Sequence, residues 1–425
     1  MNTKKRRMIV LSLDAVGSRD IEKAKDLPGF SRFFEGAGRC MAVDSVYPSI
    51  TYPAHTTIVT GRYPCHHGVV NNTKIQPGRK SPDWYWQRKY IRGTTLYDEA
   101  RSKGMTTAAL LWPVTAKAKI TYNVPEIFAN RPWTNQILTS LANGTPMYQF
   151  RLNQKFGHLR NGIREPELDN FTHASLIYTL EKYRPDLTLV HFTDVDSQKH
   201  DYGTESPEAW AAMERHSNRL MEIQDTLERL GMAEDTIFVL LGDHSQKDVS
   251  KIICLNALFL EKGWISQKRG KIRDWRVYSK GCDGSAYIYI RDRQLYPEVY
   301  ELLKELRDEK RWGIEALYTG KSAARMGADG ACAFMVEAAD GYFFRDDTET
   351  FTRLTKDGEH KGCHGYRPEK TGYQTFFALK GPGIRENQEV ERMCLADEGP
   401  TLAALLGLDL GITDGKVIHT FLEKE

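Results

Sequence analysis

Residues 8–14 read MIVLSLD, a short apolar run that ends in an acidic residue. The same theme returns far along the chain in LTLVHFTDVD (187–196) and in TIFVLLGDH (236–244). Near-continuous apolar runs of this length are typical of strands that are buried on both faces, as in parallel sheets. The three runs therefore predict central strands of one sheet, each followed by acidic residues at its carboxyl end.

Helical patterns lie between these runs. The segment 206–231 begins with Ser206-Pro207-Glu208, a good helix-start signal, and stops at Gly231. The stretches TLYDEARSKG (95–104) and PTLAALLG (400–407) also end in glycine. Strands that alternate with helices predict an α/β fold, and we expect a three-layer α/β/α sandwich with a mostly parallel central sheet.

The alternation of strand-like and helix-like patterns changes between about residues 255 and 360. YSKGCDGSAYIYI (278–290) and MVEAADGYFFRDD (335–347) indicate a smaller α+β unit. Alternation like that of the first half returns at YQTFFALKGPGI (373–384). We therefore predict that residues 1–254 and 361–425 form the core, and that 255–360 form an inserted cap domain over its functional site.

Composition excludes several classes of protein. The 425 residues carry a net charge of +3, which gives no basic footprint for nucleic acid. No stretch approaches the roughly 18 apolar residues of a membrane span, and the run 8–13 is too short for a secretory signal. The seven cysteines are scattered and form no CxxC pair, which favours free thiols and a cytoplasmic protein.

Six acidic and histidine side chains could hold metal ions. Ligands of open α/β sheets gather at the carboxyl ends of the strands, where the acidic residues above are expected to meet. Taken singly, an aspartate at a strand end is a common cap and DH a common turn. Together, carboxylates and imidazoles are the ligands that divalent metals such as Zn²⁺ accept, and six ligands suit two ions better than one. The candidates are Asp14, Asp196, His200, Asp243, His244 and His364.

Five separated blocks occur in an order that resembles the alkaline phosphatase superfamily, and within it the type I phosphodiesterase/nucleotide pyrophosphatase family. After Asp14 the blocks are TYPAHTTIVTGRYPCHHGVVNN (51–72), DVDSQKHDYG (194–203), LLGDHS (240–245) and GCHGYRPE (362–369). The family commonly has Phe-Pro-Asn-His where this chain has Tyr52-Pro53-Ala54-His55, a difference that touches no metal ligand.

The resemblance implies a role for each matched residue. It makes Thr51 the nucleophile, Asn72 a group that holds a phosphoryl oxygen, and Tyr52 an aromatic that packs against the esterified group. It also implies two zinc sites: one formed by Asp14, Thr51, Asp243 and His244, the other by Asp196, His200 and His364.

The expected reaction is hydrolysis of a phosphodiester or pyrophosphate bond in a small, nucleotide-like phosphate ester. Two zinc ions would assist it, and Thr51 would carry a phosphothreonyl intermediate. Two other activities on the same site stay open: phosphonate hydrolysis, as in phosphonoacetate hydrolase, and phosphomonoester hydrolysis. A non-enzymatic binding protein is disfavoured because all seven positions are filled, and GxSxG, Walker A and GxGxxG patterns are absent. The oligomeric state is left open.

Six other histidines and one aromatic run can be explained without a catalytic role. We expect His55, His66 and His67 to be structural, with hydrogen bonds inside loops, and His191 to be a satisfied core residue. We expect solvent around His216 and His360. The aromatic residues of DWYWQRKY (83–90) could stack on a base or pack within the protein, and the sequence favours neither; these are Trp84, Tyr85 and Trp86.

Overall fold

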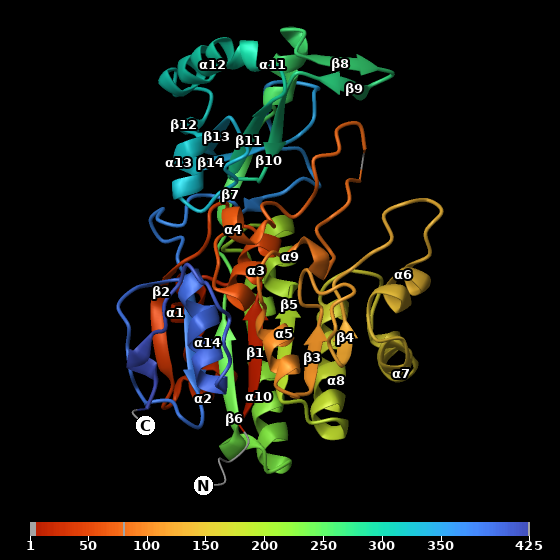
Figure 1. The fold of residues 1–425 in the computed structure, drawn as a ribbon, viewed down its shortest axis with the longest axis vertical. Helices are drawn as coiled ribbons and strands as arrows, with labels where there is room; N and C mark the ends of the chain where they lie inside the picture. Colours follow the sequence, from red (N-terminus) through yellow and green to blue (C-terminus); the bar gives the residue numbers. More distant parts are fainter. Residues whose placement is uncertain (1–5, 80, 424–425) are drawn as a thin grey trace.

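The computed structural model describes residues 6–79 and 81–423 and centres on an eight-stranded sheet (Figure 1). From one edge to the other, the strands are β18 (Met393–Cys394), β2 (Gly38–Asp44), β17 (Thr375–Lys380), β6 (Thr236–Leu241), β1 (Arg7–Leu13), β5 (Leu187–Phe192), β3 (Thr107–Leu110) and β4 (Tyr122–Val124).

The three apolar runs form the centre of this sheet. In β1, Val10 pairs in parallel with Leu189 of β5 on one side and with Val239 of β6 on the other. Strands β3 and β4 continue in parallel, while β17 runs antiparallel between β6 and β2. The prediction of a mostly parallel central sheet is therefore confirmed.

Helices cover both faces of the sheet because the side chains of β1 alternate between two apolar cores. Met8 and Val10 face the core built with α3 (Thr51–Thr60), α5 (Leu96–Ser102) and α14 (Glu398–Leu406). Ile9, Leu11 and Leu13 face the core on the other side. That side is covered by α1 (Ser18–Ala24), α2 (Pro28–Phe34), α7 (Pro146–Phe156), α8 (Glu167–Lys182) and α10 (Pro207–Arg229). The α/β/α sandwich is confirmed.

Local signals in the sequence set the ends of the longest helix. The Ser206 side chain accepts a hydrogen bond from Ala209 N at 3.1 Å, and Pro207 occupies the first turn of α10. Gly231 adopts φ 63° just beyond the end of this helix, a conformation that favours glycine. The helix predicted over 206–231 is therefore observed at Pro207–Arg229.

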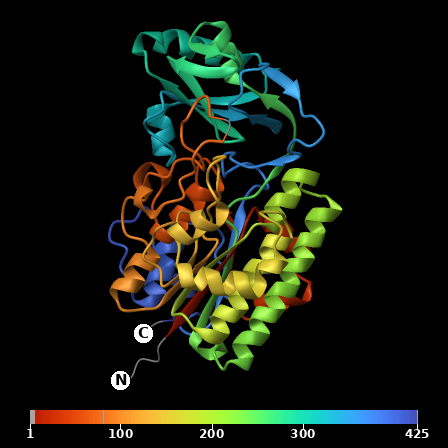
Figure 2. The same ribbon diagram turned by 90° about the vertical axis from the view of Figure 1, so that its right-hand side faces the viewer.

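Three smaller sheets lie beyond one end of the central sheet (Figures 1 and 2). The first contains β10 (Val277–Gly281), β11 (Ser285–Ile290), β13 (Phe334–Ala338) and β12 (Ile314–Thr319). The second contains β14 (Gly341–Phe344), β7 (Lys247–Ile253) and β15 (Thr352–Leu354), with β16 (Gly362–Cys363) paired to β7, and the third contains β8 (Ile265–Lys268) and β9 (Lys271–Trp275).

Three helices accompany these sheets: α11 (Leu255–Glu261), α12 (Tyr296–Asp308) and α13 (Gly320–Arg325). Strands β7 and β16 lie just outside residues 255–360, yet both pair within the second small sheet. The domain limits themselves stay a prediction.

The remaining helices lie around the central sheet. They are α4 (Pro64–His67), α6 (Gln136–Asn143) and α9 (Asp194–Tyr202), with short 3-10 turns at 88–90, 157–159, 233–235, 293–295, 395–397 and 419–421. Among residues 6–79 and 81–423, no helix combines the length and apolarity needed to cross a bilayer. All seven cysteines are free thiols, and the cytoplasmic location stays a prediction.

Candidate metal centre and active site

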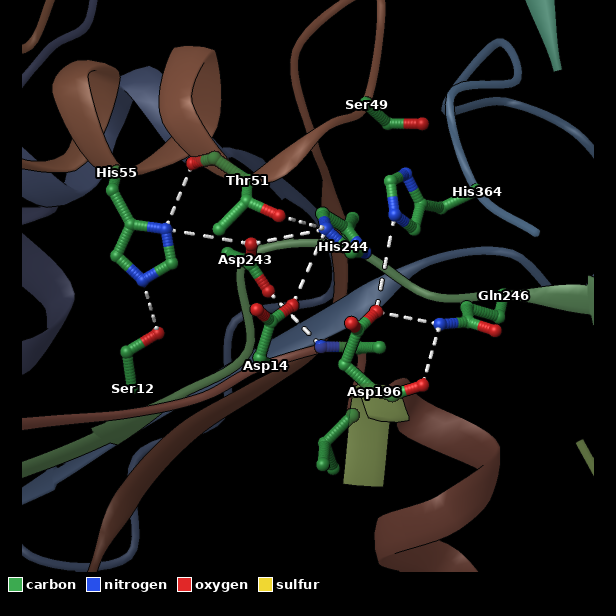
Figure 3. A network of polar contacts seen from close by, with 12 residues as sticks. Ser12, Asp14, Ser49, Thr51, His55, Asp196, Asp243, His244, Gln246 and His364 are labelled. Carbon is green, nitrogen blue, oxygen red and sulfur yellow. Dashed lines mark hydrogen bonds and ion pairs between the residues drawn. The ribbon is translucent and has the colours of Figure 1, made fainter. Parts of the chain in front are cut away.

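The first group of candidate ligands follows the central strands β1 and β6. Asp14, Asp243 and His244 each offer an atom within 4.8 Å of the others, and all three side chains are buried (Figure 3). We call them the strand-end group. They meet because β1 and β6 are parallel neighbours, so that their carboxyl ends lie at one edge of the sheet.

Tight turns hold this group in place. Ala15 takes a left-handed conformation, φ 61°, and its amide donates to Asp243 Oδ1 at 3.2 Å. A Cβ on Gly242 would lie 2.1 Å from Val16 O, so only glycine fits before Asp243. The left-handed conformation of Ala15 and the close packing at Gly242 thus bring the two carboxylates toward one another.

The strand-end group fits a cation on the grounds of charge and unused oxygens. Asp14 Oδ1 and Asp243 Oδ2 are buried and accept no hydrogen bond from the described residues. Burial, with the Asp196 charge nearby, raises the pKa of Asp14 to about 7. Burial and the charge of Asp14 also hold the pKa of Asp243 well above its usual range. Two such carboxylates stay ionised together only beside a compensating positive charge, which a divalent metal supplies.

The second group joins a helix to a distant loop. Asp196 and His200 lie one turn apart on α9, and His364 follows β16; their ligand atoms lie within 4.8 Å of one another. We call them the helix–loop group. His200 Nδ1 donates to Gly362 O at 2.7 Å, which leaves Nε2 free and 3.4 Å from Asp196 Oδ1. This pattern, with one ring nitrogen pinned to a carbonyl, is typical of metal-binding histidines.

Asp196 lies between the two histidines of the helix–loop group. Its Oδ1 accepts a hydrogen bond from Gln246 Nε2 at 2.6 Å, and His364 Nε2 lies 3.9 Å from the same oxygen. Burial opposes the charge of Asp196, but His200 and His364 outweigh it and lower its pKa. Gln246, the residue that orients this carboxylate, was not singled out by the sequence.

The two groups form one centre with Thr51 at its edge (Figure 3). The rings of His244 and His364 lie 4.2 Å apart between centroids. Thr51 starts α3, is 7% exposed, and its Oγ1 lies 3.3 Å from His244 Nε2. Pro53 falls within the first helical turn, where its missing amide costs no intrahelical hydrogen bond. The structure thus gathers all seven residues for which metal binding is predicted.

Asn72 and Tyr52 lie beside Thr51. The Tyr52 amide donates to Asn72 Oδ1 at 2.9 Å, which leaves the side-chain NH₂ of Asn72 free to point at a ligand. The Tyr52 ring is fully buried and packs against Trp84 at 5.1 Å between centroids. Trp84 and Trp86 both pack edge-on against Phe128, so this part of the aromatic run forms internal packing next to the site.

A buried chain of polar contacts runs from Asp14 to Tyr52. His191 Nε2 lies 3.0 Å from Asp14 Oδ2, and its Nδ1 lies 3.3 Å from Glu126 Oε2. Tyr52 Oη donates to Glu126 Oε1 at 3.2 Å. Burial opposes the charge of His191, but the contacts to Asp14 and Glu126 raise its pKa well above its usual range. The prediction that His191 is a satisfied core histidine is confirmed, but its partner is a candidate metal ligand.

Glu126 and Lys199 belong to the surroundings of the site and were missed by the sequence. Glu126 follows the edge strand β4 in an irregular loop, where no motif marks it. Lys199 is 2% exposed, and its ammonium donates to Ala15 O at 2.9 Å and to Asp20 at 2.7 Å. The burial of a lysine beside the Asp14–Ala15 turn could not be anticipated, since lysine in DSQKH reads as a solvated residue.

Three histidines near Thr51 make hydrogen bonds as expected from the sequence, but they lie in the helices α3 and α4 and not in loops. His55 donates from Nδ1 to Thr51 O at 2.8 Å and accepts at Nε2 from Ser12 Oγ at 2.9 Å. His67 is buried and contacts Thr57 Oγ1 at 3.1 Å, and His66 contacts the carboxylate of Asp414 at 2.8 Å.

For two other histidines the prediction that their side chains are solvated is wrong. His216 lies on the inward face of α10, is 1% exposed, and burial lowers its pKa to about 3. His360 is half-buried and its ring lies 4.3 Å from the ring of His200; burial lowers its pKa to about 4. Both errors have one cause: contacts across elements decide burial where local polarity suggests exposure.

The mostly parallel sheet and the paired ligand groups agree with the class expected from the sequence, the metal-dependent hydrolases of the alkaline phosphatase superfamily. The model of the protein family described as "Type I phosphodiesterase / nucleotide pyrophosphatase" matches residues 8–367 of this chain. The chain belongs to this family, and it is a phosphodiesterase/nucleotide pyrophosphatase-family hydrolase.

Its relatives are distant in sequence. Ectonucleotide pyrophosphatase/phosphodiesterase family member 1 of Homo sapiens is 23% identical over 228 residues, which cover 51% of this chain and 20% of that protein. Bis(5'-adenosyl)-triphosphatase enpp4 of Mus musculus is 22% identical over 97% of this chain and 80% of its own. The solved structure of murine ectonucleotide pyrophosphatase/phosphodiesterase 5 is similar with a TM-score of 0.70, at 19% identity and over 98% of this chain and 100% of the other.

Proposed function

We propose that this protein hydrolyses phosphodiester or pyrophosphate bonds of nucleotide-like substrates with Thr51 as the nucleophile. One observation carries the proposal: Thr51 Oγ1 lies 3.3 Å from His244 Nε2, at the helix start beside two groups of carboxylates and imidazoles. The histidine that this hydroxyl contacts, His244, belongs to the strand-end group, so we assign it to a metal ion and not to the role of a base. Activation of the hydroxyl therefore calls for metal ions.

The residues present fit two zinc ions. Asp14, Thr51, Asp243 and His244 would hold one ion, and Asp196, His200 and His364 the other, each set being a mixture of carboxylate and imidazole ligands. When bound, the ions would lower the pKa of a hydroxyl or water and offset the negative charge of the phosphoryl group. The unused oxygens of Asp14 and Asp243 support this assignment.

The protein's own residues would divide the reaction into two displacements. In the first, Thr51 Oγ1 forms a bond to phosphorus while the bond to the leaving oxygen breaks and that group departs. In the second, a water molecule displaces Thr51 from phosphorus, which regenerates the hydroxyl and releases the phosphorylated product. The start of α3 favours the negative charge of the phosphoryl group near Thr51.

Asn72 and Tyr52 would orient the substrate. The free NH₂ of Asn72 can donate to a non-bridging oxygen, because its carbonyl oxygen is already engaged by the Tyr52 amide. Trp84, which packs on the buried ring of Tyr52, and Phe128, which packs on Trp84, are partly exposed and would form an apolar wall for the esterified group. The loop between β10 and β11 brings Asp283 Oδ2 to 3.7 Å from His364 Nδ1, which makes the predicted cap a wall on the other side.

The names of two relatives support nucleotide substrates. The murine relative enpp4 is described as a bis(5'-adenosyl)-triphosphatase. For murine family member 5, a threonine-to-alanine variant described as inactive was solved in complex with AMP. These statements concern those proteins, and for this chain they support a threonine nucleophile and an adenylate-like substrate.

A panel of four substrates tests the proposal. We expect hydrolysis of p-nitrophenyl thymidine monophosphate to exceed that of bis(p-nitrophenyl) phosphate, with p-nitrophenyl phosphate and phosphonoacetate the weakest. EDTA should abolish the activity and zinc should restore it. Preference for p-nitrophenyl phosphate would identify a phosphomonoesterase, and preference for phosphonoacetate a phosphonate hydrolase. Full activity after metal removal would overturn the two-metal account.

A further inference from the structure

Large apolar side chains gather on the outside of one segment, residues 127–164, which we call the apolar–basic surface. It contains α6 and α7, which lie together at the side of the molecule that Figure 2 turns toward the viewer (Figures 1 and 2). Trp133 is 80% exposed, Leu138 67% and Ile163 69%. The other exposed apolar residues of this segment are Ile137, Met147 and Phe150.

The segment is held to the core by its opposite face, so its exposed side chains belong to an ordered element. Tyr148 of α7 is buried, and its hydroxyl lies 2.5 Å from Thr179 Oγ1 of α8. The ring of Tyr148 also packs against Tyr122 and Tyr183. Gln149 Nε2 donates to Ser140 O at 2.9 Å, which joins α7 to α6. With its inward face satisfied in this way, α7 leaves Met147 and Phe150 outside without a partner in the fold.

The charge of this segment is strongly one-sided. Residues 127–164 contain no Asp or Glu, and their five basic residues are Arg131, Arg151, Lys155, Arg160 and Arg164. The whole chain has a net charge of only +3, so this segment is a local concentration of positive charge. A concentration of this kind attracts an anionic partner at a distance of about one Debye length.

Most of these basic groups have no acidic partner. Arg131 pairs with Asp83. The other four form no ion pair within residues 6–79 and 81–423: Arg151 donates to Tyr183 Oη, Lys155 lies over the ring of Tyr178, and Arg160 lies over the ring of Phe171. Arg151, Lys155 and Arg164 are exposed. Their charges are therefore available to a partner.

The mixture of side chains favours a lipid surface over a nucleic acid. A nucleic acid would use the basic groups and could stack on Trp133, but aliphatic side chains such as Leu138 and Ile163 gain little from phosphates and base edges. At a bilayer surface these aliphatic groups enter the boundary between headgroups and acyl chains, while arginine and lysine contact anionic headgroups. A tryptophan is also well suited to that boundary.

We propose that the apolar–basic surface docks the enzyme reversibly on membranes that contain anionic lipids. The docking surface starts next to the site. Phe128 packs against Trp84 and Trp86, and Glu126, just before the segment, contacts Tyr52 and His191. The proposal concerns binding and does not depend on the reaction assigned to Thr51.

The experiment uses the full chain and vesicles of two compositions. One is pure phosphatidylcholine, and the other contains about 30% phosphatidylserine; co-sedimentation gives the fraction bound. We expect binding to the anionic vesicles, weak binding to the neutral ones, and a steep loss of binding between 50 and 500 mM salt, because salt screens the basic groups. No binding to the anionic vesicles, or equal binding to both kinds, would overturn the proposal.

Variants separate this surface from the rest of the protein. Arg151→Gln with Lys155→Gln should weaken binding to anionic vesicles about 25-fold, since each basic group contributes about fivefold. Leu138→Gln with Phe150→Gln should weaken it at least about tenfold. Matched controls on exposed positions elsewhere are Lys321→Gln with Arg293→Gln for charge and Leu354→Gln with Ile412→Gln for apolarity. If the controls weaken binding as much as the variants, the surface is not the docking site.

Two further readouts complete the test. Circular dichroism and hydrolysis of a soluble substrate should be unchanged in all four double variants, because none of the substituted residues touches the site. Single-stranded DNA of about 20 nucleotides is the competing ligand. Binding of DNA in preference to anionic vesicles, lost in the same variants, would assign the surface to nucleic acid and overturn the membrane proposal.

Discussion

The two ligand groups of the site are built from similar side chains but rest on different parts of the molecule. The strand-end group is fixed to neighbouring strands of the central sheet, and its three side chains are at most 4% exposed. The helix–loop group combines α9 with the loop after β16; the side chains of Asp196 and His200 are 16% and 14% exposed, and that of His364 is 5% exposed. The first is a rigid, buried concentration of negative charge, and the second is a more open set of imidazoles.

This difference in burial suggests different roles for the two ligand groups. A buried site that contains uncompensated carboxylates binds a cation tightly, because removing the ion leaves charge in a low-dielectric interior. A site at the surface, partly built by a loop, exchanges its ion and water more easily. We therefore expect the strand-end group to activate the nucleophile Thr51, and the helix–loop group to face the departing group and the incoming water.

The largest expected effect tests the position of Thr51 beside the strand-end group. Thr51→Ala should lower kcat by at least about 10³-fold, because it removes the hydroxyl proposed to attack phosphorus. Metal content, measured by mass spectrometry of the purified protein, should be unchanged within about half an equivalent of ion, since the six other ligands remain.

Two variants control this result. Thr51→Ser should keep part of the activity, because it retains the hydroxyl. Thr56→Ala removes a buried hydroxyl of the same helix that donates to Tyr52 O, and it should affect stability more than turnover. Retention of full activity by Thr51→Ala would exclude Thr51 as the nucleophile.

The next effect tests the independence of the helix–loop group. His364→Ala should lose about one equivalent of metal and reduce kcat/KM by about 100-fold or more, because the charge on the leaving oxygen is no longer offset. The metal held by Asp14, Asp243 and His244 should remain. Loss of both ions together would mean that the two groups form a single cooperative site.

A smaller effect is expected from the residue that orients Asp14. His191→Gln should weaken binding of the ion at the strand-end group by about 10- to 100-fold, as is typical when the partner of a metal ligand is replaced. Competition with a fluorescent chelator measures this affinity, and the ion at the helix–loop group should be unaffected.

His216→Gln is the matched control, because His216 is also buried but has no contact with either ligand group. An equal loss of metal affinity in this variant would show that His191→Gln acts through general destabilisation. Unchanged affinity after His191→Gln would show that Asp14 is oriented without His191.

The smallest effect compares the strand-end group, in which Asp14 Oδ1 and Asp243 Oδ2 accept no hydrogen bond from the described residues, with a buried carboxylate whose two oxygens both accept one. Glu337 of β13 accepts hydrogen bonds from Tyr47 Oη at 2.8 Å and from Arg367 N at 2.9 Å. Burial nevertheless raises its pKa to about 8, from a usual value of 4.5. Between these values the folded state binds more protons than the unfolded state, so Glu337 makes stability fall as pH rises.

Glu337→Gln should therefore reduce this fall by at most about 1.4 kcal/mol per pH unit between pH 5 and 8, without change in metal content. Urea unfolding at four pH values measures it. An unchanged pH dependence would place the pKa of Glu337 near its usual value. A change in metal content would show that the small sheets and the ligand groups are coupled.

Much of the fold was readable because the central strands carry an unmistakable pattern. Runs such as MIVLSLD are buried on both faces, so continuous apolarity identifies β1, β5 and β6 as central strands of a mostly parallel sheet. That they are neighbours was shown by the structure. The ends of α10 were readable from Ser206, Pro207 and Gly231. The antiparallel direction of β17 was not readable, because strand direction depends on the path of the intervening chain and not on the strand's own residues.

Some residues of the site could likewise be predicted from the sequence, and others could not. Asp14, Asp196 and Asp243 follow apolar strands, so their convergence at one sheet edge was predictable. Glu126 and Lys199 lie in segments without a motif, and their burial results from contacts made only after folding. His216 and His360 were placed in solvent for the same reason, since a polar neighbourhood in sequence says nothing about which distant element will cover it.

The sequence by itself determined the class of the protein: the sheet, the helices around it and six candidate ligands follow from short local patterns, and the ordered motifs that resemble the family added Thr51. Only the tertiary structure decided how these parts differ from one another. It buried the strand-end group and left the helix–loop group more open, linked His191 and Glu126 to Asp14, and left the apolar–basic surface uncovered. The physical reason is that patterns report a residue's own preference, whereas burial, charge compensation and exposure are properties of all the neighbours that folding assembles.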